Sequence, residues 1–474
     1  MNGKEQVKTL LLVFLVISNL VLGCRIWIQK KLWPDGYNFF YSIKNSSIIR
    51  MIADKGASLY AQSHIALPDR IIINTGYQTT RFLLNSTHER FKFANDTAYE
   101  VLTEAFSADA RYISEISEEE WYSALTSRSV YLSYDINYSS DIMPQFFENR
   151  RTDLEQFTDI ISDVVISDAD TGGISVIFKN GRENKYYRVQ LQNFSKENID
   201  KLISYFQNKF DENDTKSSMI INYSFELLFD KANESQRVII APMIPIFNTP
   251  VTYEKIKSEN PITRTDGTPD SQTIKELLDI FDINSNSMRR HTERNGTVVF
   301  VENDTILKLS PDGYLTYTSN RNSGILNSGG SLYTAVCMVS EFMDRINYIS
   351  GSNADLYISS DLTDMNYDKA RITFDYIVGG IPVTIENPEF SHAVEVTVEN
   401  GYITEYRQVL RSYEMTSAVM QTPMYIQAID SVSDNGGSDK YTSVEKMYVS
   451  YFDDLSIGEK EADWRLIVNE LEQS

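Results

Sequence analysis

One long apolar run near the start of the chain is the feature that most constrains its fold. Residues 10–28 read LLLVFLVISNLVLGCRIWI, and as a helix this segment would be about 28 Å long, close to the ~30 Å hydrocarbon core of a bilayer. No later segment is comparably apolar. We therefore predict a single transmembrane helix at 10–28. The basic residues on its two sides give no clear orientation, so a cytoplasmic tail at 1–9 and an extracellular body are expected from the signal-like N-terminus and the scarcity of cysteines.

The N-terminus also fits two other processing routes. Lys4 and Lys8 precede the apolar run as they would in a cleaved signal peptide. Val21–Cys24 has the layout of a lipoprotein cleavage box, in which the cysteine would carry the lipid. We favour the uncleaved anchor, because Ile26–Ile28 continues the apolar helix beyond the cysteine.

One face of the predicted transmembrane helix carries an amide. Asn19 lies near mid-membrane, where a polar side chain is stabilised by bonding to a partner helix. Helical spacing places it in a stripe that we predict to contact another transmembrane helix, and the alternative is a tolerated polar residue in a simple anchor. The stripe consists of Leu12, Leu15, Val16, Asn19, Gly23 and Ile26.

The charge of the chain argues against nucleic-acid binding. The formal net charge is −22, although residues 1–31 hold five basic residues and one acidic residue. A body this acidic repels phosphate backbones. Cys24 and Cys337 are the two cysteines, so the sequence offers no disulfide framework and no cysteine metal site.

The rest of the sequence predicts an α+β fold of antiparallel sheets with packed helices. More than one domain is expected, since single hydrophobic cores rarely exceed about 300 residues. Polar stretches at 211–218 and 284–290 suggest the boundaries. We expect a juxtamembrane linker at 29–40, an N-terminal domain at 41–214, a middle domain at 215–290 and a C-terminal domain at 291–474.

Turn and cap residues locate individual elements. Asn180-Gly181, Gly379-Gly380 and Asn400-Gly401 are hairpin signals, and the last two suit type I′ turns. Ser117–Glu120 fits a helix capping box. Helices are expected at 96–106 behind an Asp96 cap, 195–210, 271–281, 331–346 and 419–429, and strands at 70–74, 130–134, 174–178, 186–192, 219–228, 237–241, 297–302, 305–309, 314–318, 371–378, 381–385, 393–398, 402–407, 444–452 and 464–468.

Patterns that carry catalysis or metal binding are scarce. The four histidines are scattered, without the spacing of metal ligands on a helix. They are His64, His88, His291 and His392, of which His392 is also considered as a pH or ligand sensor. We predict that the protein is not an enzyme, has no catalytic, cofactor-binding or metal site, and needs no cofactor.

Three weaker patterns have structural explanations. Ser443 and Lys446 match S-x-x-K, but they lie in a strand-like run without the companion motifs. Residues 168–173 begin like a calcium loop, but Lys179 stands where the twelfth-position carboxylate should be. Glu118–Glu120 is an acidic first turn, which the helix dipole favours.

The chain resembles the YycH family in its layout and in several segments. The N-terminal ones are Arg25-Ile-Trp27, Pro68–Ile73, Ser117–Trp121 and Val130–Tyr134, and the C-terminal ones are Ile372–Val383, Val394–Tyr406 and Trp464. The middle segment and Val21–Cys24 depart from the pattern.

The resemblance implies a role as well as a fold. YycH proteins regulate the WalK (YycG) sensor histidine kinase of Gram-positive bacteria from outside the cell, together with YycI, partly through transmembrane-helix contacts. It implies three extracytoplasmic domains, the last of them YycI-like, and as partners a kinase of this type, a YycI-like protein and optionally a second copy. The alternatives are a lipoprotein-type binding module and a cell-envelope enzyme.

Overall fold

The computed structural model describes most of the chain after residue 66. The described residues are 67–76, 81–149, 151–168, 172–192, 194–211, 219–226, 238–262, 270–320, 324–326, 330–363, 365–435 and 441–471. All of them belong to one compact unit, Gly56–Ser474. In this part of the chain no helix has the length and apolar character needed to cross a bilayer. The tail, anchor and linker predicted at 1–9, 10–28 and 29–40 lie outside the described residues.

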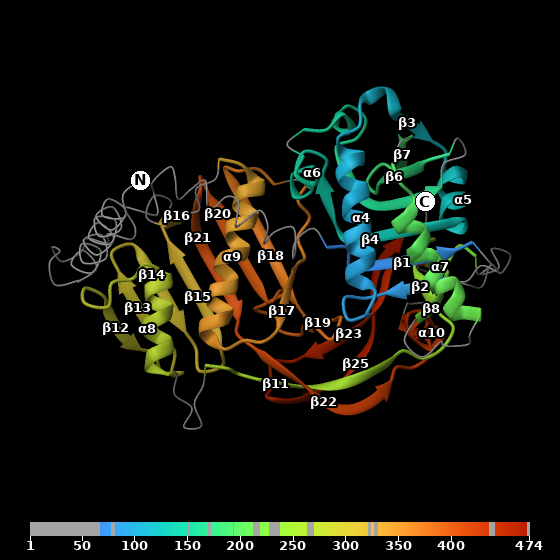
Figure 1. Ribbon diagram of the computed structural model, residues 1–474. Helices are drawn as coiled ribbons and strands as arrows, with labels where there is room; N and C mark the ends of the chain where they lie inside the picture. Colours follow the sequence, from blue (N-terminus) through green and yellow to red (C-terminus); the bar gives the residue numbers. More distant parts are fainter. Residues whose placement is uncertain are drawn as a thin grey trace, which may run out of the picture. The chain divides into compact units, whose positions relative to one another are not determined.

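The first half of the chain builds an antiparallel sheet, here called the N-terminal sheet (Figure 1). β1 (Arg70–Thr75) lies in its middle, paired with β2 (Arg81–Leu84) and β4 (Arg128–Ser139). The strand order is β10 (Pro245–Phe247), β8 (Met219–Tyr223), β2, β1, β4, β5 (Ile160–Asp168), β6 (Ile174–Asn180), β7 (Lys185–Leu191) and β3 (Ile113–Ile116).

Helices cover both faces of the N-terminal sheet. Ile71 and Ile73 pack in the core that includes α4 (Phe91–Phe106) and α7 (Glu197–Asp211). Ile72 points to the other face and packs with Trp121 of α5 (Glu118–Thr126). Burial on both faces explains why β1 reads as a continuous apolar run. Short helical turns lie at Met143–Phe146 (α6), Ala110–Tyr112 (η2) and Asp153–Gln156 (η3).

The second half of the chain builds a larger sheet, here called the C-terminal sheet. Its pairs are antiparallel except that β23 runs parallel to both β19 and β9. The main order is β12 (Arg289–Thr292), β13 (Val298–Glu302), β14 (Thr305–Leu309), β15 (Tyr314–Ser319), β21 (Tyr402–Val409), β20 (Val394–Glu399), β18 (Lys369–Val378), β19 (Ile381–Ile385), β23 (Tyr441–Asp453) and β25 (Ala462–Leu471), with β16 (Ile325–Leu326), β17 (Asp355–Ile358) and β9 (Val238–Ile240) beside β21, β18 and β23.

Three helices pack against this second sheet. α8 (Ser271–Ile280) and α9 (Leu332–Ser350) contact each other, and Figure 1 shows both on the same side of the strands. Phe281, Phe342 and Tyr406 form an edge-to-face aromatic cluster in that core. α10 (Tyr425–Asn435) contacts β9 and β25 instead.

A small third sheet is assembled from distant segments. β11 (Thr252–Glu259) is its central strand, paired antiparallel with β22 (Ser412–Gln421) and β24 (Gly458–Lys460). Strands from 215–290 thus take part in all three sheets: β8 and β10 in the first, β9 and β12 in the second, and β11 in the third. The boundaries expected at 214/215 and 290/291 remain predictions.

The structure confirms the α+β class with large antiparallel sheets, and it confirms most predicted elements. The turns at Gly379-Gly380 and Asn400-Gly401 have positive φ at both central residues, and Ser117 and Glu120 form the expected capping box. The hairpin of β6 and β7 also forms, with Asn184 at positive φ in its turn.

Two predictions of helix position are wrong. The helix expected behind Asp96 begins five residues earlier, because Phe91 and Ala94 belong to the same buried face. Residues 419–429 do not form one helix: β22 continues to Gln421 and α10 begins at Tyr425. Pro423 separates them, since proline disfavours helical geometry in the residue before it.

Candidate functional site

The residue patterns noted in the sequence are explained by structural contacts. Ser443 donates to Glu445, and the Lys446 ammonium donates to the carbonyl oxygen of Asp135 at 2.6 Å. Asp168 pairs with Lys196 at 2.8 Å, although residues 169–171 of the proposed calcium loop lie outside the described part of the chain. Within the described residues, no group of three or more His, Cys, Asp or Glu side chains is placed to hold a metal.

The acidic helix start and the histidines also have structural partners. Glu120 closes the cap of α5 and pairs with Arg188 at 3.0 Å. His88 accepts a hydrogen bond from the backbone of Arg90, and His291 lies exposed on β12. His64 and the six residues of the predicted transmembrane stripe lie outside the described residues.

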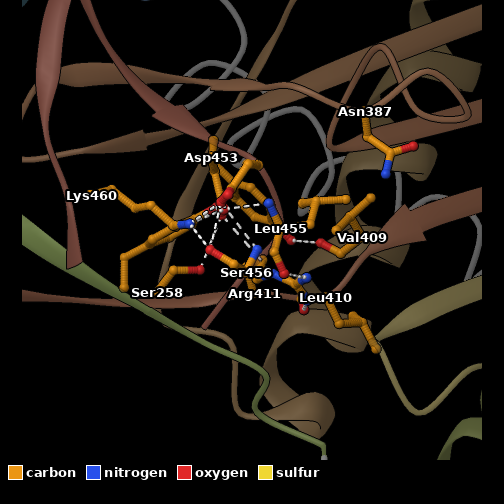
Figure 2. Close-up of polar contacts among 12 residues, drawn as sticks. Ser258, Asn387, Val409, Leu410, Arg411, Asp453, Leu455, Ser456 and Lys460 are labelled. Atoms are coloured by element: carbon orange, nitrogen blue, oxygen red, sulfur yellow. Dashed lines mark hydrogen bonds and ion pairs between the residues drawn. The ribbon is translucent and has the colours of Figure 1, made fainter. Parts of the chain in front are cut away.

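A buried ionic cluster lies where the third sheet meets β23 (Figure 2). Asp453 ends β23 and is fully buried. Its carboxylate accepts hydrogen bonds from the hydroxyls of Ser258 at 3.0 Å and Tyr413 at 2.8 Å, and from the backbone of Leu455 at 2.8 Å. Lys460 of β24 lies 3.3 Å from the same carboxylate. One buried side chain therefore joins β11, β22, β23 and β24.

The two cations of this cluster, Arg411 and Lys460, both bind oxygen atoms of the protein. Arg411 is 2% exposed, and its guanidinium donates to the carbonyl oxygens of Asp312, Leu410 and Leu455, each at 2.9 Å. Lys460 also contacts Asp454, and this hydrogen bond holds the pKa of that carboxyl well below its usual range. With both cations engaged by protein oxygens, we interpret the cluster as a structural clamp.

A polar cleft lies between the N-terminal and C-terminal sheets. We define it by Asp69, Arg70 and Asp135 on one wall and Tyr357 and Tyr448 on the other. Two cavities of about 90 and 240 Å³ meet there, and both are lined by Asp69 and Tyr357. In the cleft, ionisable groups of both large sheets lie together, and apolar residues such as Leu83, Ile381 and Val449 complete its lining.

One carboxylate of the polar cleft, Asp69, has its pKa shifted by its surroundings. Asp69 accepts a hydrogen bond from the backbone of Asp135, and Arg70 pairs with Asp135 at 3.3 Å. Burial, followed by the charge of Asp135, raises the pKa of Asp69 to about 8. Asp69 therefore holds a proton at neutral pH, which spares the cleft a second adjacent negative charge.

His392, considered as a sensor, lies in a hydrogen-bonded pair. Its Nδ1 is 2.9 Å from a carboxylate oxygen of Asp375 and 3.2 Å from the hydroxyl of Ser359. The hydrogen bond to Asp375 is the main reason that the pKa of His392 is raised. This geometry fits a positioned loop residue at the start of β20.

Sequence reasoning missed the cleft and the clamp. Asp69 and Asp135 lie 66 positions apart, and Ser258 and Asp453 lie 195 apart. The single local signal was Asp69 itself, a carboxylate immediately before an apolar strand. Lys446 was noted for S-x-x-K, whereas its contact is with Asp135.

Comparisons with known proteins point to one fold. Neither a protein-family model nor a curated protein matches the sequence. The crystal structure of YycH from Bacillus subtilis aligns with a TM-score of 0.56 over 86% of this chain and 95% of that chain, at 11% sequence identity. The chain has the fold of YycH.

The alignment with YycH from Bacillus subtilis includes nearly all of that protein's chain. The resemblance to the YycH family is thus confirmed at the level of the fold. An uncharacterized protein from Eubacterium rectale ATCC 33656 aligns over 50% of this chain and 83% of that chain at 12% identity, and its TM-score of 0.31 is too low to support an argument.

Proposed function

We propose that the protein is a non-enzymatic, membrane-anchored regulator of a sensor histidine kinase of the WalK/YycG type. The observation that supports this proposal is the YycH fold, which covers 86% of this chain and 95% of the neighbour. The apolar segment at 10–28 is long enough to serve as the proposed anchor, with the body that follows it outside the cell. A YycI-like protein is the second partner that the proposal includes.

The proposed mechanism is a differential contact with two states of the kinase. The stripe around Asn19 would pack beside a transmembrane helix of the kinase, and the extracellular body would bias the position of that helix. A partner shifts an equilibrium only as far as it binds the two states differently. A coupling of about 1–3 kcal/mol changes the population ratio about 5- to 150-fold.

The test is recovery of the kinase with the full-length protein from solubilised membranes. We expect a co-expressed WalK-type kinase to be retained on the tagged protein, and its autophosphorylation to change when the protein is present. Replacing Asn19→Leu should lower kinase recovery about threefold, because interhelical polar contacts contribute about 0.6 kcal/mol on average. A YycI-like protein is tested in a parallel arm.

The control for the stripe is Ser18→Leu. This change also removes a polar side chain from the apolar segment, but helical spacing places Ser18 off the stripe. Equal loss with both variants would refute the stripe, and no kinase recovery with the unchanged protein would refute the function. Mass measurement of the mature N-terminus distinguishes the intact anchor from a lipid on Cys24 and from cleavage.

A further inference from the structure

The outer strand of the small third sheet exposes apolar side chains. Met415 is 50% exposed, Val419 is 62% exposed and Met420 is 38% exposed, all on β22. Figure 1 shows β22 running outside β11. Exposed apolar side chains on an edge strand are typical of sites where a strand of another chain pairs with the sheet.

The free edge of β22 carries neither lysine nor proline, two of the residues that commonly protect an edge strand from pairing. In the described residues β22 pairs with β11 alone, and on its other side the amide of Asn353 bonds to the backbone of Tyr413 at 2.8 and 3.0 Å. From Glu414 to Gln421 the strand contains one charged residue and neither lysine nor proline. A bulge with Ser417 at φ 62° divides the edge, so Val419–Gln421 forms a separate short run.

That short run ends at an open, acidic groove. The groove has a volume of about 610 Å³, and Met420 and Gln421 form part of its wall. Two lysines already pair with carboxylates of the groove, which still outnumber them: Lys460 contacts Asp454, and Lys255 lies 2.6 Å from Glu461 and 3.8 Å from Glu459. Five carboxylates line it: Glu386, Asp454, Glu459, Glu461 and Asp463.

We propose that the β22 edge and the acidic groove together dock an extended basic polypeptide segment. Apolar side chains of the segment would cover Met415, Val419 and Met420, and its lysines or arginines would enter the groove. Strand addition supplies backbone hydrogen bonds, and charge complementarity selects a basic partner. The proposal does not rest on the proposed kinase function.

Charge argues against the other occupants of this surface. A second copy would approach with the same net charge of −22 and would be repelled. An anionic lipid surface would be repelled for the same reason. A basic polypeptide is the partner whose charge the groove complements.

The experiment measures binding of three labelled decapeptides to the full-length protein in detergent by fluorescence anisotropy. One peptide alternates valine with lysine, one alternates serine with lysine and one alternates valine with glutamate. We expect the valine–lysine peptide to bind, the serine–lysine peptide to bind at least tenfold more weakly, and the valine–glutamate peptide not to bind.

Variants locate the binding on the surface. Val419→Lys should weaken binding of the valine–lysine peptide at least tenfold. Ile306→Lys, at an exposed position on β14, should leave that binding unchanged. Replacing Glu386→Gln together with Glu459→Gln should weaken binding several-fold and reduce its salt dependence. The matched control is the pair Glu115→Gln and Glu155→Gln, which are exposed in the N-terminal half.

Three outcomes would overturn the proposal. The first is equal binding of the valine–lysine and serine–lysine peptides, which would show charge attraction alone. The second is unchanged binding to Val419→Lys protein. The third is sedimentation showing self-association that Val419→Lys abolishes, which would identify a second copy as the occupant.

Discussion

At the scale of single residues, Asp453 connects three strands other than its own. Its buried carboxylate accepts hydrogen bonds from Ser258 and Tyr413 and faces Lys460. Removing one partner from a buried ion pair leaves an uncompensated charge, which costs more than the pair contributes. The cluster is therefore sensitive to neutralisation of its anion.

Asp453→Asn should strongly destabilise the protein. The change keeps the shape of the side chain but leaves Lys460 and Arg411 without the carboxylate, and we expect a loss of about 3–5 kcal/mol in the free energy of unfolding. Urea denaturation followed by circular dichroism measures it. Asp454→Asn is the control, because Asp454 is exposed and its loss should cost under about 1 kcal/mol. Equal destabilisation by Asp453→Asn and Asp454→Asn would contradict the role of Asp453 in the buried clamp.

Asp69 predicts a pH dependence of stability. Its pKa is about 8 in the folded protein and 3.8 in its ordinary state. Between these values the unfolded chain releases a proton that the folded protein keeps, so this group makes stability fall as pH rises from about 4 to 8.

Asp69→Asn should remove that slope. Relative to the unchanged protein, the variant should gain about 1–3 kcal/mol between pH 4 and pH 8, a range discounted for the partial solvent exposure of Asp69. Urea midpoints at pH 4, 6 and 8 test it, with the exposed Asp109→Asn as control. Parallel profiles for the unchanged protein and Asp69→Asn would show that the proton is not held there.

At the scale of elements, the turn between β18 and β19 has two tasks. Gly380 has φ 76°, and a Cβ atom added there would lie 3.0 Å from the Asn85 side chain. The glycine therefore closes the hairpin and permits close contact with the residue that follows β2. The sequence predicted the first task from Gly379-Gly380, but not the second, which depends on a residue almost 300 positions away.

Gly380→Ala should cost about 1–3 kcal/mol, from positive φ and from crowding against Asn85. The matched control is Gly330→Ala, which has φ 71° but no atom within 4 Å of an added Cβ. The difference between the two variants, measured as thermal unfolding midpoints, isolates the crowding. Equal destabilisation would mean that the contact with Asn85 adjusts freely.

Local signals account for the elements that the sequence predicted correctly. Hairpin turns and the capping box at Ser117 depend on residues close together in the chain, so they can be predicted from the sequence. The prediction that Asp96 caps a helix was wrong because Asp96 lies inside α4, whose buried face begins earlier in the chain. The order of strands, the polar cleft and the clamp depend on pairs far apart in sequence, for which a single chain gives no signal.

At the scale of the whole described unit, the two large sheets are joined by specific hydrogen bonds. The backbone and side-chain nitrogens of Asn137 donate to the Asp361 carboxylate at 2.8 and 2.9 Å, and Leu362 donates back to the Asn137 carbonyl at 2.9 Å. Lys446 adds a contact to Asp135 nearby. These contacts tie β4 to the C-terminal half of the chain beside the polar cleft.

Asp361→Ala should loosen the junction without unfolding either sheet. Two hydrogen bonds are lost, and we expect about 1–3 kcal/mol less protection of the junction. Hydrogen exchange at residues 137 and 362 should rise about 5- to 150-fold, while exchange in β20 stays unchanged. Asp368→Ala, at an exposed aspartate in the turn before β18, is the control. Unchanged exchange at 137 and 362 would refute the role of Asp361.

The origin of the third sheet has a consequence for biogenesis. β11 is made about 150 residues before one of its neighbours, β22, and about 200 residues before the other, β24. At ribosomal speeds of about 5–20 residues per second, the nascent strand waits roughly 8–30 s with both edges bare. During that interval it is a target for holdase chaperones and for mispairing, and a polypeptide truncated ahead of β22 would never satisfy it.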